Sequence, residues 1–178
     1  VIDADKVGHE AYLPGTGTWR EVVQAFGEGI LGDAEEIDRE KLATVVFSDS
    51  EALRRLNTIL HPRMYNMMEK RLSELREQGI KVVVLEAALL LEANWVSLVD
   101  EVWLVTTPKD VVLARLRGRD RFDERSAKAR IGVQMGDTER NEFATIVIEN
   151  NGTLGELERS ITALWNERVT RCQENRNR

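Results

Sequence analysis

The chain has 178 residues, of which 42% are hydrophobic and 31% are charged, and its formal net charge is −6. This length and balance predict one folded domain with a substantial core, and they argue against a disordered chain or a nucleic-acid-binding protein. No apolar run approaches a membrane span, and the single cysteine, Cys172, permits no internal disulfide. We therefore expect a cytoplasmic protein without nucleic-acid or membrane partners, whose oligomeric state the sequence does not predict.

The chain opens with the apolar pair Val1-Ile2, followed by Asp3-Ala4-Asp5. This pattern is typical of a buried parallel strand that ends at the rim of an α/β sheet. In an extended strand the two carboxylates would face the same side, where one could take a proton from an attacking hydroxyl or hold Mg²⁺ through water. Alternatively, Asp5 is only the N-cap of the next helix. The spacing alone leaves both readings open.

Helices are expected throughout residues 6–79. Gly15-x-Gly17 has no lysine after it and predicts a turn and helix start rather than a phosphate loop. Proline restricts the residue before it, so His61-Pro62 predicts a helix break, with a second helix from Pro62 to Gly79. The other expected helices span Lys6–Tyr12, the segment from Thr16 to Gly27, the segment after Asp38, and the segment opened by a capping box at Ser48–Glu51.

Three apolar runs predict buried strands at residues 80–85, 101–105 and 145–148. Together with the opening segment they alternate with helices, which predicts an α/β fold with a parallel sheet. Glu86 follows the first run and is a candidate metal-site carboxylate, although a lone acid after a strand is a weak signal. Further helices are expected after Thr107-Pro108, over Asp123–Met135 and after Thr153.

Basic residues are concentrated in one stretch of this acidic chain: Arg115, Arg117, Arg119, Arg121, Arg125, Lys128 and Arg130. Guanidinium groups match phosphate oxygens, so the stretch predicts phosphate recognition. The alternative is an exposed helical surface with weak ion pairs.

The ordered set of short motifs resembles the dephospho-coenzyme A kinase family, P-loop kinases that phosphorylate the 3′-hydroxyl of the ribose of dephospho-CoA. The matching segments are Val1-Ile2-Asp3-Ala4-Asp5, Pro14-Gly15, Phe26-Gly27, Ile37-Asp38-Arg39 with Leu42, Val46-Phe47, Leu56-Asn57 with Ile59 and His61-Pro62, Leu89-Leu90-Leu91-Glu92, Arg115-Leu116 with Arg119-Asp120, Arg130-Ile131 with Gln134, and Val147-Ile148-Glu149-Asn150.

The resemblance implies a P-loop NTPase fold of the nucleoside-kinase type, with a three-layer parallel sheet. Its core would span 1–5, 80–114 and 144–170, its acceptor-binding helices 6–79, and its helical lid 115–143. ATP with Mg²⁺ and dephospho-CoA are the implied substrates, and the last step of coenzyme A synthesis is the implied reaction. The alternatives are another small-molecule or nucleotide kinase and an inactive CoA-binding homologue.

The resemblance also implies roles for individual residues. Asp5 would be the general base, and Glu86 would contact the metal through water. Arg115, Arg119, Arg130 and Asn150 would bind ATP. The residues implied in acceptor binding are Asp3, His9, His61, Arg63, Leu89 and Glu92.

The sequence departs from the family pattern in two places. Ala88 stands where the family has proline, and no G-x-x-x-x-G-K-[ST] motif occurs. We therefore expect the natural protein to carry a further βα unit of roughly 30 residues with the phosphate loop. We also expect the 178 residues alone to be inactive.

Overall fold

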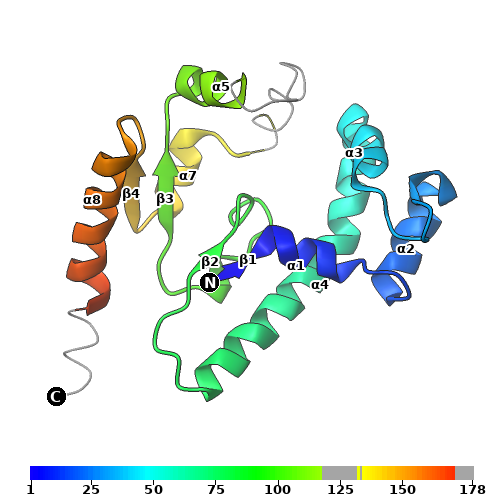
Figure 1. The fold of residues 1–178 in the computed structure, drawn as a ribbon, viewed down its shortest axis with the longest axis horizontal. Coiled ribbons are helices and arrows are strands. Elements are labelled where there is room, and N and C mark those ends of the chain that lie inside the picture. Colours follow the sequence, from blue (N-terminus) through cyan, green and yellow to red (C-terminus); the bar gives the residue numbers. More distant parts are fainter. Residues whose placement is uncertain (118–131, 133, 171–178) are drawn as a thin grey trace. The chain divides into compact units, whose positions relative to one another are not determined.

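The computed structural model describes residues 1–117, 132 and 134–170. The chain forms two compact units, Val1–Ala93 and Asn94–Arg178 (Figure 1). Each unit contains one pair of parallel strands with helices around it. This arrangement confirms the α/β class with parallel strands that the sequence predicts. Along the described residues, no helix is long and apolar enough to cross a membrane.

In the first unit, β1 (Ile2–Asp3) pairs with β2 (Leu85–Glu86), and Asp3 lies in register with Glu86. The prediction of a buried strand over 80–85 is wrong in its length and its burial, because β2 has two residues and the Ile80 and Val84 side chains are 47% and 43% exposed. The physical reason is that β1 offers only two residues for pairing before the chain turns into a helix at Ala4.

Four helices complete the first unit: α1 (Ala4–Ala11), α2 (Gly17–Phe26), α3 (Arg39–Ser48) and α4 (Ser50–Glu77). The predicted helix starts at Thr16 and after Asp38 are confirmed, and the two side chains cap α2 and α3. The predicted capping box at Ser48 is wrong: Asp49 caps α4 by accepting the Glu51 N–H, and the Ser48 hydroxyl instead donates to the Val45 carbonyl.

The core of the first unit lies where α2 and α3 pack against α4. Its buried side chains come from these helices and from the connection between α2 and α3. They are Val22, Ile30, Ile37, Leu42, Val46, Ala52, Leu56 and Leu60. The first half of α4 therefore carries the shared apolar face of this unit.

The predicted break at His61-Pro62 is wrong, because α4 continues through Pro62 without interruption. Proline inside a helix removes one backbone hydrogen bond and crowds the preceding turn. Buried side chains lie on both sides of the proline, Leu60 before it and Met68 after it, so packing stabilises both halves of the helix. Tertiary packing thus overrides the local preference.

In the second unit, β3 (Trp103–Thr106) pairs in parallel with β4 (Ile146–Glu149). Among the described residues of this unit, the α-helices are α5 (Lys109–Arg117), α7 (Asp137–Phe143) and α8 (Leu154–Trp165). Thr153 caps α8 with a complete capping box, which confirms the predicted start of this helix. Most of the helix predicted over Asp123–Met135 lies outside the described residues.

The continuous α4 leads to a stability prediction for Pro62→Ala. The substitution restores a backbone donor inside a helix, so we expect the free energy of unfolding to rise, by up to about 3 kcal/mol. Urea denaturation followed by circular dichroism measures this change.

Pro14→Ala is the control, because Pro14 precedes Gly15 (φ 83°) in a turn closed by the Thr16 N–H and the Leu13 carbonyl. Proline suits this turn position, so its loss should lower stability slightly. A loss of stability in Pro62→Ala would contradict a continuous α4.

Candidate functional site

Asp3 is the last residue of β1, and its carboxylate caps α1. Its Oδ1 accepts the N–H groups of Asp5 (3.0 Å) and Lys6 (3.2 Å), and the Lys6 ammonium lies 3.5 Å from Oδ2. The hydrogen bond from the Lys6 N–H, aided by the Lys6 charge, lowers the pKa of Asp3 below its ordinary value. Asp3 is therefore an ionised cap at neutral pH.

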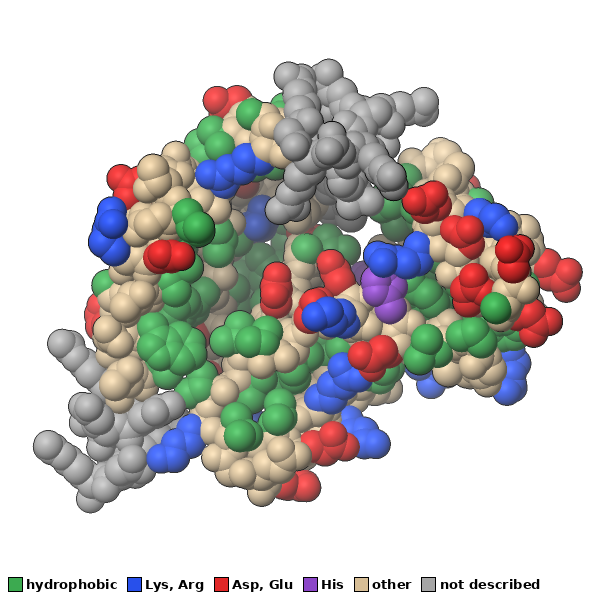
Figure 2. Space-filling model, in the orientation of Figure 1, with side chains coloured by type: hydrophobic (Ala, Val, Ile, Leu, Met, Phe, Trp, Pro, Cys, Tyr) green, Lys and Arg blue, Asp and Glu red, His purple; other side chains and the backbone are tan. Residues whose placement is uncertain are grey.

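Asp5 lies in the first turn of α1 with an exposed side chain. The expectation that Asp3 and Asp5 share one side of an extended strand is wrong, because the helix already begins at Ala4. At the ends of β1 and β2, the residue in register with Asp3 is Glu86. Figure 2 shows acidic side chains grouped around the start of α1. Of the two readings left open for Asp5, the capping role belongs to Asp3 instead.

His9 follows Asp5 by one turn of α1, and such residues are neighbours on a helix surface. Its ring meets the Tyr12 ring edge-on, with centroids 6.0 Å apart. Partial burial and the positive charge of Arg39 lower the pKa of His9, although the carboxylates of Asp5 and Asp3 act in the opposite direction. His9 is therefore neutral at pH 7.

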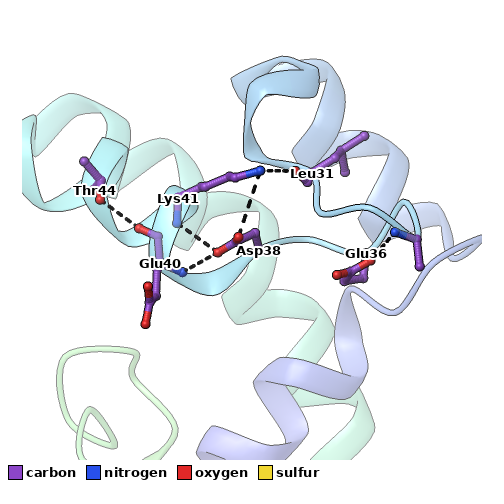
Figure 3. Close-up of polar contacts among 7 residues, drawn as sticks. Leu31, Glu36, Asp38, Glu40, Lys41 and Thr44 are labelled. Atoms are coloured by element: carbon purple, nitrogen blue, oxygen red, sulfur yellow. Dashed lines mark hydrogen bonds and ion pairs between the residues drawn. The ribbon is translucent and has the colours of Figure 1, made fainter.

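Arg39 is a residue that the site prediction missed, although it lies in one of the motifs that carry the family resemblance. Figure 3 shows how the start of α3 is fixed: the Asp38 carboxylate accepts the N–H groups of Glu40 (2.9 Å) and Lys41 (3.1 Å). The Lys41 ammonium also donates to the Leu31 carbonyl at 2.7 Å. These contacts fix the first turn of α3, which begins at Arg39. The positive charge of Arg39 acts on the ionisation of both His9 and Tyr12.

The remaining predicted acceptor residues lie on α4 and in the turn after β2. His61 is half-buried, and this burial lowers its pKa. The exposed Arg63 forms an ion pair with Glu21 (3.2 Å), which connects α4 to α2. Leu89 and Glu92 are half-buried in the turn segment 88–94. All six predicted acceptor residues therefore belong to the first unit.

In the second unit, Arg115 and Asn150 come together at the carboxyl ends of β3 and β4. The Arg115 Nη2 donates to the Asn150 main-chain carbonyl at 3.1 Å, and the Thr107 hydroxyl donates to the same oxygen at 3.2 Å. Thr107 is a second residue that the site prediction missed, since the sequence indicated only the start of a helix after Thr107-Pro108. Arg119 and Arg130 lie outside the described residues.

Comparison with known proteins gives a consistent answer. A family model described as dephospho-CoA kinase matches residues 1–156. The dephospho-CoA kinase of Geobacter sulfurreducens is 44% identical over 94% of this chain and 85% of its own length. That of Moorella thermoacetica is 40% identical over 94% of this chain and 79% of its own length.

Solved structures show the same fold. The crystal structure of TT1252 from Thermus thermophilus aligns with a TM-score of 0.72 at 30% identity, covering 94% of this chain and 84% of its own. The structure of dephospho-CoA kinase from Campylobacter jejuni aligns with a TM-score of 0.64 at 24% identity, covering 93% and 83%.

The half-buried His61 makes stability depend on pH. Its pKa in the folded state lies below the ordinary 6.5, so the unfolded chain binds the proton more readily. The contribution is therefore fully present above about pH 6.5 and is lost as pH falls through the lowered pKa. We expect the melting temperature to fall between pH 7.5 and pH 5, and the slope to flatten in His61→Gln.

His9→Gln is the matched comparison and should flatten the slope as well, since burial also lowers the pKa of His9. Thermal melts at fixed ionic strength give the slopes. The pKa of Asp3 lies below its ordinary value of 3.8, so Asp3 does not contribute to the slope between pH 5 and pH 7.5. Equal slopes in the wild type and both variants would contradict the neutral histidines.

Proposed function

The chain belongs to the dephospho-CoA kinase family, and from this membership we propose how its residues carry out the family's reaction. The enzyme is an ATP-dependent kinase that phosphorylates the 3′-hydroxyl of dephospho-CoA, the final step of coenzyme A biosynthesis. We assign a P-loop kinase fold to it, which its parallel strand pairs support. A cytoplasmic location is in keeping with its single cysteine, which can form no internal disulfide.

Asp5 is the general base of this proposal. It takes the proton of the 3′-hydroxyl while the oxygen attacks the γ-phosphorus of ATP and the bond to the leaving ADP oxygen breaks. The observation that carries the assignment is that the two aspartates have different structural roles. Asp3 supplies the helix cap, so the exposed Asp5 carboxylate is not needed for that purpose.

Acceptor binding is assigned to the first unit, through Asp3, His9, His61, Arg63, Leu89 and Glu92. Neutral histidines support this role, because an uncharged imidazole can both donate and accept hydrogen bonds to a ribose or an amide. Arg39 joins this group by its influence on His9, the residue one turn along α1 from the base. Its positive charge suits an acceptor that carries a diphosphate.

ATP binding is assigned to Arg115 and Asn150, with Arg119 and Arg130 as further phosphate ligands. Arginine in this position would neutralise charge on the transferred phosphoryl group, in line with the usual source of catalysis in phosphoryl transfer. The contact between Arg115 and Asn150 at the ends of two parallel strands supports the pairing of their roles.

Mg²⁺ would enter with ATP. Within the described residues there is no group of three or more His, Cys, Asp or Glu side chains that could hold a metal ion. Mg²⁺ keeps several waters and needs only one or two carboxylates besides the phosphates, so the neighbouring Asp3 and Glu86 fit this kind of binding. Glu86 would act through water, in line with the waters that Mg²⁺ usually keeps. When bound, the ion would neutralise charge on the phosphates.

The two aspartates give the test of the base. In the complete gene product we expect Asp5→Asn to lower kcat by about 10²- to 10⁴-fold, because the amide cannot take the proton. The KM for ATP and the melting temperature should remain near the wild-type values. ADP release in the presence of ATP and dephospho-CoA measures the rate.

Asp3→Asn is the matched control. Asparagine caps helices as well as aspartate does, so this variant should keep its stability. Because Asp3 is itself assigned to acceptor binding, its substitution should raise the KM for dephospho-CoA, while kcat falls far less than in Asp5→Asn. A variant Asp5→Asn with wild-type kcat would overturn the assignment of the base.

A further inference from the structure

Thr107 follows β3 directly and reaches across to the residue that follows β4. Its hydroxyl donates to the Asn150 carbonyl at 3.2 Å, a contact between residues 43 positions apart. The Asn150 N–H also donates to the Thr106 carbonyl at 2.8 Å. Asn150 is thus tied to the end of β3 through both its N–H and its C=O group.

The Asn150 carbonyl is the point where Arg115 is attached. A carbonyl oxygen has two lone pairs, and here both Thr107 and Arg115 donate to it. The contact uses Nη2 of Arg115, whereas a guanidinium carries five N–H donors in a rigid plane. An arginine held in this way still has donors left for phosphate oxygens.

We propose that Thr107 is a positioning residue for ATP binding, because it fixes the carbonyl that orients the Arg115 guanidinium. The inference rests on the proposed role of Arg115 as an ATP-phosphate ligand. An exposed arginine loses considerable side-chain freedom when it binds a phosphate, and holding it beforehand lowers that cost. Without the threonine hydroxyl, the peptide group after Asn150 loses the contact that fixes it, and Arg115 loses its orientation.

Thr145, at the other end of the same strand pair, provides the control for a purely structural role of Thr107. The Thr145 hydroxyl oxygen accepts the Val102 N–H at 3.1 Å, just before β4 begins. Thr107→Val and Thr145→Val each remove one hydroxyl that connects β3 to β4 and change the volume little. Only Thr107 contacts the acceptor of Arg115.

The experiment compares Thr107→Val, Thr107→Ser, Thr145→Val, Arg115→Met and the double variant Thr107→Val/Arg115→Met in the complete gene product. KM is measured for ATP and for dephospho-CoA, together with kcat and the melting temperature. We expect Thr107→Val to raise the KM for ATP roughly three- to tenfold, the effect of one lost hydrogen bond, with the KM for dephospho-CoA unchanged. Thr107→Ser should restore the wild-type value, and Thr145→Val should change only the melting temperature.

The double variant separates positioning from stability. If Thr107 acts through Arg115, adding Thr107→Val to Arg115→Met produces no further rise in the KM for ATP. A rise in the double variant equal to that in the single variant would overturn the inference, as would a Thr107→Val variant with unchanged KM for ATP. An Arg115→Met variant with wild-type KM for ATP and wild-type kcat would instead overturn the proposed role of Arg115 itself, and the inference with it.

Discussion

The hydrogen bonds that the Asp3 carboxylate accepts from the first turn of α1 determine where the proposed catalytic residues of the first unit lie. They end β1 after two residues and turn the chain into a helix at Ala4. As a result, Asp5 stands on a helix with His9 one turn further along, rather than beside Asp3 on a strand. The Asp3 cap thus sets the length of β1 and places the proposed base one helical turn before His9, an assigned acceptor residue.

Helix α4 gives this arrangement its rigid support. α1, α2 and α3 all pack against α4, so the proposed acceptor residues on α1 and α4 are held by one element. Gly8 allows α1 to come close, because a side chain at this position would meet the Met64 side chain at 3.3 Å. The ion pair between Arg63 and Glu21 adds a connection between α4 and α2 at the surface.

The sequence predicted the elements whose signals are local. The predicted helix starts at Thr16, after Asp38 and at Thr153 are confirmed, and each of these side chains accepts an N–H group within three residues. The continuous α4 and the shortened β2 escaped prediction, because packing and strand pairing decide them, not neighbours in sequence. Arg39 and Thr107 were missed as site residues for the same reason: their interactions join residues 27 or more positions apart, as from Tyr12 to Arg39 or from Thr107 to Asn150.

Both strand pairs place their polar groups by the same geometry. Parallel strands end at the same edge, so residues that follow two different strands become neighbours without any closeness in sequence. Asp3 and Glu86 lie in register in this way at the ends of β1 and β2, and Thr107 contacts Asn150 just after β3 and β4. After β3 and β4, the group that Arg115 contacts is the main-chain carbonyl of Asn150, which no side-chain substitution removes. In our inference, the side chain that holds this carbonyl therefore orients Arg115. For this reason an uncharged threonine can position the arginine to which we assign the ATP phosphates.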